Sequence, residues 1–142
     1  MSDNFPHESS RRAKARRIAW LWLPVITYAA VIFILSSISE TPSLPEGISD
    51  KSVHGGLYAG FALVIVRALA RGRWAGVTFL GACLAVGLAV LYGVSDEFHQ
   101  SFVPGRTADV ADVAADAWGA GVAASVAWII ARLGSRGAGA RI

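Results

Sequence analysis

Apolar residues fall into four long runs that are separated by short polar segments. The runs cover about residues 18–38, 53–69, 74–93 and 113–133, and the last one contains Asp116. The helix that holds the last run is expected to cover about residues 110–133. A helix needs roughly 20 apolar residues to cross the hydrocarbon of a bilayer, and each run is near that length. Backbone amides in hydrocarbon must be bonded internally, and the runs do not alternate as barrel strands do. The pattern predicts an all-α integral membrane protein with four transmembrane helices in a compact bundle.

The segments outside this four-helix domain, residues 18–133, are polar. We expect residues 1–17 to form a basic N-terminal segment, with its first twelve residues unstructured, and residues 134–142 to form a flexible tail. The first run has the basic flank of a signal peptide, but a cleavable apolar core is only about 7–15 residues long. No small-residue cleavage site follows Ile38. We therefore expect an uncleaved first helix, with Pro24 in its first turns, where proline disturbs a helix least.

Composition agrees with a membrane protein, because 54% of the residues are hydrophobic and 16% are charged, against roughly 25% charged in soluble domains. The net charge is +3, but the basic residues flank apolar runs, so we expect no nucleic-acid partner. Cys83 is the single cysteine. It allows neither an intramolecular disulfide nor a cysteine-based metal site.

The distribution of charge predicts an orientation. Eleven of the 13 lysines and arginines lie in the N-terminal segment, between the second and third runs, or in the tail, whereas the opposite loops hold only Lys51 and Arg106. By the positive-inside rule, both termini are expected in the cytoplasm. Eight of the ten acids lie on the other side: Glu40, Glu46, Asp50, Asp96, Glu97, Asp109, Asp112 and Asp116. Acids contribute little to orientation, so their concentration requires another cause.

The first polar segment begins the second helix. Lys51, His54 and Tyr58 are spaced i, i+3, i+7 and share one helix face, and either Ser49 or Asp50 caps the helix start. Lys51 and Tyr58 can be explained without a binding site, as a lysine and an aromatic residue that anchor the helix at the membrane interface. Such anchoring does not explain a histidine one turn into an apolar helix, so His54 is the stronger candidate.

The second segment follows the third run. Glu97 and Gln100 share a face if the helix continues here, and Asp96 lies four residues before Gln100. Pro104 and Gly105 are typical of a type II turn, which would bring Arg106 to the start of the fourth helix. His99 is a weaker candidate.

The third segment is the start of the fourth helix, where Asp109, Asp112 and Asp116 lie on one face. The helix dipole accounts for Asp109, but Asp116 lies deeper and needs a partner inside the bundle. The three segments can converge on a pocket that sets the bases Lys51, His54 and Arg106 against the acids Asp50, Glu97, Asp112 and Asp116. Such a group is either a network that holds the helices together or a site for a polar or anionic head group.

These residues form a recognisable pattern: Asp50-Lys51-x-x-His54-x-x-x-Tyr58, then Asp96-Glu97-Phe98-His99-Gln100-x-Phe102-Val103-Pro104-Gly105-Arg106, then Asp112-x-x-x-Asp116-x-x-Gly119-Ala120. With Ser36-Ser37, the pattern resembles the VanZ-like family over roughly residues 21–133. The family often has asparagine where this chain has Asp116. The resemblance implies a small multi-pass protein of the bacterial inner or plasma membrane. Its founding member is tied to resistance to teicoplanin, a glycopeptide antibiotic that acts on cell-wall precursors.

Three functions remain open. The favoured hypothesis is a cell-envelope protein with an extracytoplasmic pocket that binds an anionic lipid or cell-wall-precursor head group without catalysis. Its binding residues would be Lys51, His54, Tyr58, Glu97, Gln100, Arg106, Asp112 and Asp116.

The second is a membrane enzyme acting on a phosphorylated or glycosylated lipid, with His54 as base or nucleophile, Glu97 or Asp112 as acid, and Arg106 as charge stabiliser. The third is an oligomeric transporter or channel. We expect no cofactor and no metal, because a metal held by His54, His99 and carboxylates would need ligands from separate segments. The sequence leaves the oligomeric state open.

Overall fold

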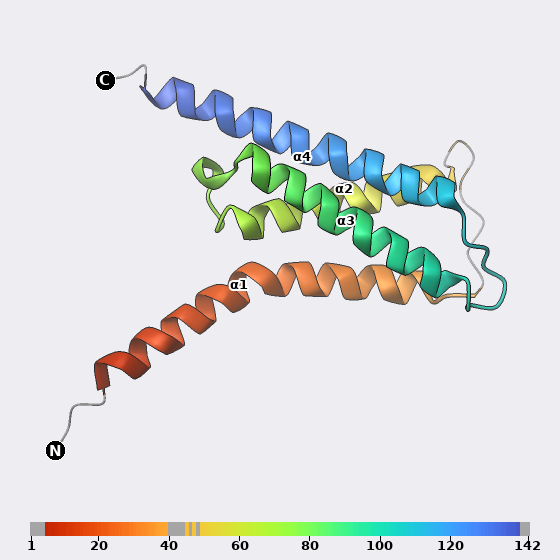
Figure 1. The fold of residues 1–142 in the computed structure, drawn as a ribbon, viewed down its shortest axis with the longest axis horizontal. Helices are drawn as coiled ribbons and strands as arrows, with labels where there is room; N and C mark the ends of the chain where they lie inside the picture. Colours follow the sequence, from red (N-terminus) through yellow and green to blue (C-terminus); the bar gives the residue numbers. More distant parts are fainter. Residues whose placement is uncertain (1–4, 40–44, 46, 48, 140–142) are drawn as a thin grey trace.

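The computed structural model describes residues 5–39, 45, 47 and 49–139. Within them the chain forms four α-helices and one short 3₁₀ turn, and it forms no strand (Figure 1). The helices are α1 (Phe5–Ser36), α2 (Asp50–Leu69), α3 (Phe79–Gln100) and α4 (Val110–Gly139), and the 3₁₀ turn η1 (Trp74–Gly76) lies between α2 and α3. Each α-helix is long and apolar enough to cross a membrane. The predicted four-helix membrane architecture is therefore confirmed.

The ends of the helices differ from the predicted limits. α1 begins at Phe5, 13 residues before the first apolar run, so Pro24 lies inside the helix and not in its first turns. α3 begins at Phe79, after η1, and continues to Gln100 instead of ending near residue 93. α4 continues to Gly139, through most of the expected tail. The helices are longer than the apolar runs because hydropathy predicts only the part of a helix that can contact lipid. Alanine, arginine and lysine favour a helix, so the helix can continue beyond the apolar run.

Small residues bring the helices together. α4 packs most extensively on α2 and then on α3, and α1 packs mainly on α2. A very close approach joins Gly55 of α2 to Gly119 of α4, where a Cβ atom on Gly119 would overlap the Gly55 carbonyl oxygen. Alanines with almost no exposed surface fill the core beside Tyr58, Phe61 and Ile65. Close packing of small residues is the usual means of association between membrane helices.

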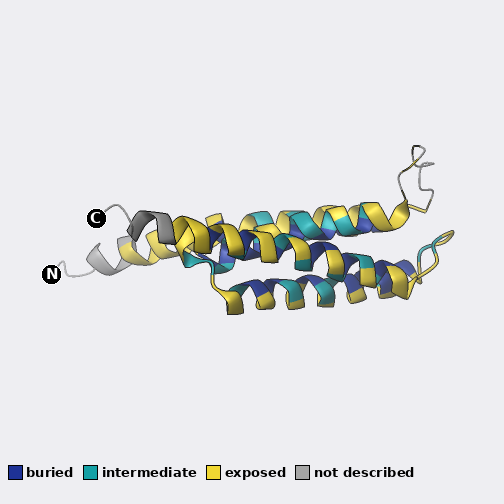
Figure 2. Ribbon diagram, turned by 90° about the horizontal axis from the view of Figure 1, so that it is seen from above, coloured by how far each residue is buried: buried dark blue, intermediate teal, exposed yellow. Residues whose placement is uncertain are grey.

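Large apolar side chains cover the outside of the bundle. Phe79, Leu91 and Trp118 are examples, with 65%, 68% and 75% of their surface exposed. Figure 2 shows that, where the helices lie beside one another, buried positions face the other helices and exposed positions face outward. Such a surface suits contact with lipid chains.

The buried polar side chains gather at one end of the bundle. α1 and α3 end there, and α2 and α4 begin there (right side of Figure 1). Among the described residues, the buried polar and charged side chains are Ser36, His54, Asp96, Glu97, Gln100, Asp112 and Asp116. We call this region the polar end.

Candidate functional site

Capping and turn chemistry position the site. Ser49 is the N-cap of α2, and its hydroxyl accepts a hydrogen bond from the Ser52 amide at 3.2 Å. The Arg106 amide donates to the Val103 carbonyl oxygen at 3.1 Å, and Gly105 has φ of +80°. These are features of a type II turn with Pro104 and Gly105 at its centre. The turn brings Arg106 back toward α3 before α4 begins.

Ion pairs and a hydrogen bond join α2 to α4. The Lys51 ammonium donates to Asp109 Oδ2 and to Asp112 Oδ1, each at 2.9 Å. One turn deeper, His54 Nδ1 lies 3.1 Å from Asp116 Oδ1. An ionised carboxylate only accepts hydrogen bonds, so Nδ1 is the donor, and in the neutral imidazole Nε2 then carries no proton. The stripes predicted on the two helices therefore face each other.

Gln100 is the centre of the network on α3. Its side-chain amide nitrogen donates to Asp96 Oδ2 at 3.1 Å and to Glu97 Oε1 at 3.4 Å. Its side-chain oxygen accepts from Arg106 Nε at 3.1 Å and from Arg106 Nη2 at 2.6 Å. Asp96 Oδ1 accepts from the Ser36 hydroxyl at 2.7 Å, which connects α3 to α1. The network orients Arg106 through Gln100, and Arg106 forms no direct ion pair with an Asp or Glu among the residues that the structure describes.

Glu97 connects the end of α3 to the start of α4. Its Oε2 accepts a hydrogen bond from the Asp109 amide at 2.8 Å, while Oε1 faces Gln100. The neighbouring Asp109 carboxylate accepts from the Ala111 amide and from Lys51. These two interactions, the first being the stronger, lower the pKa of the Asp109 carboxyl. Both acids thus stabilise the loop that carries Arg106.

A cavity of about 720 Å³ opens between α1, α2 and the loop before α4. Its polar lining comes mainly from His54, Tyr58, Asp96, Gln100, Arg106, Asp50 and Asp112. Its apolar lining comes from Ile32, Leu35 and Ile38 near the end of α1 and from Val53 and Leu57 of α2. The cavity therefore has an apolar side and a charged side.

The predicted binding residues divide into two groups. His54, Tyr58, Gln100, Arg106 and Asp112 line the cavity. Lys51, Glu97 and Asp116 are absent from its lining and contact residues that support it. The three catalytic candidates, His54, Glu97 and Asp112, therefore do not share one accessible surface.

Asp96 and Ser36 also line the cavity although neither was among the predicted binding residues, and Asp50, which was predicted among the acids of the pocket, lines it too. Asp96 is only 4% exposed. Its place in the second polar segment, four residues before Gln100, is the sequence feature that could have identified it. His99 lies apart, because its ring stacks on Phe33 at 4.4 Å and its Nε2 is 2.9 Å from the Ser37 hydroxyl. The acids Glu40 and Glu46 lie outside the described residues.

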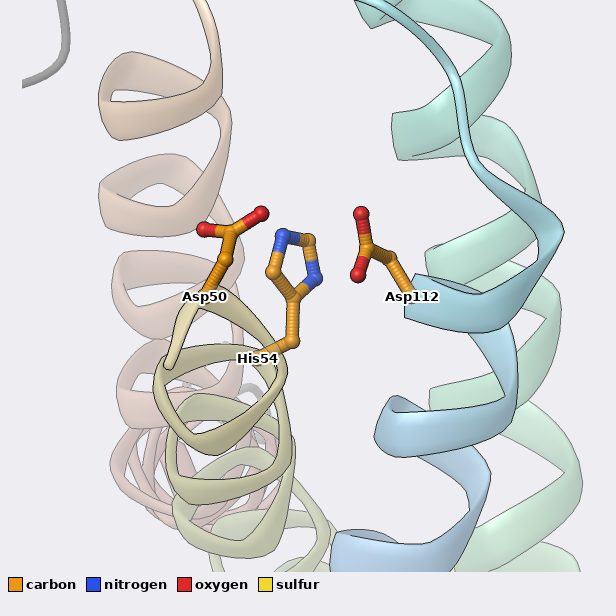
Figure 3. A group of neighbouring side chains, drawn as sticks. All are labelled: Asp50, His54 and Asp112. Carbon is orange, nitrogen blue, oxygen red and sulfur yellow. The ribbon is translucent and has the colours of Figure 1, made fainter. Parts of the chain in front are cut away.

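One group of side chains could hold a metal ion. Potential ligand atoms of Asp50, His54 and Asp112 all lie within 4.8 Å of one another. Figure 3 shows the imidazole of His54 between the two carboxyl groups, with Asp50 and His54 on α2 and Asp112 on α4. His99, the other histidine considered for a metal, is not in this group.

The chain was compared with curated proteins, solved structures and protein families. Comparison with curated proteins and with solved structures finds no match. A family model described as VanZ/LLP1 matches residues 16–131, which include the polar end and most of each of the four candidate membrane-spanning helices, and the chain therefore belongs to the VanZ/LLP1 family.

Proposed function

We propose that this VanZ-type membrane protein serves the bacterial cell envelope by binding the anionic head group of a lipid or lipid-linked cell-wall precursor at its polar end. The observation that carries the proposal is the two-sided cavity, with apolar residues of α1 and α2 opposite Arg106, His54 and Gln100. An amphiphile needs both kinds of wall. In the proposed orientation, supported by the positive-inside rule, the polar end is extracytoplasmic.

Arg106 supplies the anion contact. A guanidinium has five N–H donors in a fixed plane. Two of its nitrogens donate to the Gln100 side-chain oxygen, and that pairing holds the plane at the cavity wall. The remaining donors suit the bidentate binding of a phosphate or carboxylate.

The apolar wall supplies contact for the chain of the amphiphile. Ile32 and Leu35 of α1 and Leu57 of α2 line the cavity below the charged residues. α1 packs against the bundle less extensively than α4 does, so the wall that α1 forms is the less constrained one. This arrangement supports entry from the bilayer and not only from water.

Catalysis and transport have less support. Both oxygens of Glu97 are engaged by Gln100 and the Asp109 amide, which does not favour a proton-transfer role. Below Tyr58, the buried side chains of the described helices are apolar, including Phe61 and Ile65. A transport path would need polar groups through that region. A role in glycopeptide resistance would be a consequence of head-group binding and not a separate activity.

Binding to a short isoprenyl phosphate tests the proposal, with the corresponding isoprenol as the ligand control. The full chain in nanodiscs is titrated as wild type and as Arg106→Ala. Hydrogen bonds to a charged group contribute roughly 1.5–3 kcal/mol, so binding should weaken about 10–150-fold. The isoprenol should bind wild type and variant equally.

Arg73→Ala is the matched control, because Arg73 is exposed beyond the opposite end of α2. It should bind like the wild type. Equal binding of the phosphate and the isoprenol to the wild type, or equal loss of binding in both arginine variants, would refute the proposed site.

A further inference from the structure

The polar end carries more negative than positive charge. Six carboxylates, of Asp50, Asp96, Glu97, Asp109, Asp112 and Asp116, occur with two permanently charged bases, Lys51 and Arg106. Charges in or near hydrocarbon are costly unless they are paired. The excess of carboxylates over bases therefore favours the binding of a cation at this end.

We propose that Asp50, His54 and Asp112 bind a divalent transition-metal ion, Zn²⁺ or Mn²⁺. Their ligand atoms already lie within 4.8 Å of one another. Ligands of one Zn²⁺ ion at about 2.0–2.2 Å are roughly 3–4 Å apart, so small side-chain rotations suffice. The proposal concerns the metal alone and does not rest on head-group binding.

The surroundings of His54 prepare it to bind a metal. Its Nδ1 is held by Asp116 Oδ1 at 3.1 Å, and Asp116 is 1% exposed. This leaves Nε2 as the ligand atom, and a carboxylate behind a histidine is the usual arrangement that fixes the ring in metal sites. Asp112 uses Oδ1 for Lys51, so its Oδ2 remains for the metal.

Tyr58 provides an independent indication. Its side chain is 1% exposed and lines the same cavity, yet its hydroxyl has no hydrogen-bond partner among the described residues. Buried polar groups in proteins are nearly always bonded, and an exception requires an explanation. A polar ligand bound in this cavity would offer the hydroxyl a partner.

The ligand types select the metal. Two carboxylates with one imidazole suit Zn²⁺ or Mn²⁺, whereas Ca²⁺ and Mg²⁺ prefer sites with oxygen alone. Three protein ligands leave at least one coordination position open, as in metal sites that bind a further group. All three side chains line the cavity, so a further ligand would reach the ion from the cavity.

Metal content and affinity test the proposal directly. The full chain, carrying an affinity tag without histidine, is purified in detergent and dialysed against a chelator. It is then titrated with Zn²⁺ and Mn²⁺ by calorimetry, and bound metal is counted by mass spectrometry. The wild type should bind about one ion per chain, as a site with one histidine and two carboxylates holds one metal.

The variants separate a built site from surface binding. Asp50→Asn and His54→Ala should weaken Zn²⁺ binding more than tenfold, and His99→Ala should leave it unchanged. Asp50 is exposed, so Asp50→Asn tests the site even if His54→Ala fails to fold. Failure of the wild type to bind either metal stoichiometrically, or wild-type affinity in Asp50→Asn, would overturn the proposal.

Discussion

Replacing Gly119 by alanine tests whether the contact between α2 and α4 depends on the absence of a side chain. A Cβ atom at this position would overlap the Gly55 carbonyl oxygen and lie 2.7 Å from the Gly55 carbonyl carbon. The obstacle is backbone, so it cannot rotate away as a side chain can. The two helices must separate, or the bundle must lose stability.

The magnitude follows from the cost of overpacking. Adding a methyl group to a filled contact typically costs about 1–3 kcal/mol. Alanine also favours a helix over glycine by up to about 1 kcal/mol, which would hide part of this cost. Gly121→Ala removes the ambiguity, because a Cβ atom on Gly121 meets nothing within 4 Å and the substitution lies in the same helix. The free energy of unfolding should be lower in Gly119→Ala than in Gly121→Ala by about 1–3 kcal/mol.

Reversible unfolding in mixed detergent micelles measures this difference, with the fluorescence of the five tryptophans as the signal. The same helix pair carries the Lys51–Asp112 and His54–Asp116 contacts. Separation of the helices should therefore also lower the affinity of the polar end for its ligands. Equal stability of the two alanine variants would contradict a direct backbone contact between α2 and α4 at Gly119.

Two further predictions concern the same end of the bundle. Gly93→Ala should destabilise the protein by about 1–3 kcal/mol in the same unfolding assay, because its Cβ would lie 2.7 Å from Asp116 Oδ2, and Asp116 is buried and bonded to His54, so its side chain has little room to move. Gly87→Ala, which meets nothing within 4 Å in the same helix, should not, and equal effects would contradict the contact. The second concerns pH: the Asp109 pKa is lowered by the Ala111 amide and Lys51, so this carboxylate stabilises the fold above its unfolded pKa of about 3.9. Wild type should therefore be more stable than Asp109→Asn at neutral pH, and this difference should shrink as the pH falls below about 4. Thermal unfolding of both proteins between about pH 7 and 3 measures it. A difference that stays constant over this range would contradict the reasoning.

The sequence predicted the helices because hydrocarbon requires long uncharged segments, and it predicted the polar faces because helical spacing is regular. Asp116 was predicted to need a partner inside the bundle, and His54, predicted as a site residue, is that partner, with Nδ1 3.1 Å from Asp116 Oδ1. The pairing itself depends on how α2 rotates against α4, which the Gly55–Gly119 contact determines. No local spacing contains that information.

The same limit explains the differences in the network. Arg106 was expected among acids, but its recorded hydrogen bonds are to Gln100. The bond from Ser36 to Asp96 joins residues 60 positions apart and depends on the place of α1 beside α3. Helix ends were also missed, because the charged residues after Gly93 and before Ile18 favour a helix as well as a loop.

The two proposals together predict coupling between the metal and the head group. A phosphate at Arg106 would approach the carboxylates of Asp50 and Asp112, which line the same cavity, and would be repelled by them. A bound Zn²⁺ ion would remove this repulsion and offer the phosphate an open coordination position. Coupling free energies of this kind are about 1–3 kcal/mol, and they act equally in both directions.

Zn²⁺ should therefore strengthen isoprenyl phosphate binding about 5–150-fold in the wild type, and the phosphate should strengthen Zn²⁺ binding by the same factor. Asp50→Asn should lose most of this coupling because it loses the metal. Arg106→Ala should bind the metal normally but gain less from it. If the phosphate binds equally well with and without Zn²⁺ in a wild type shown to hold the ion, the metal and the head group act at independent places, and the cavity is not one site.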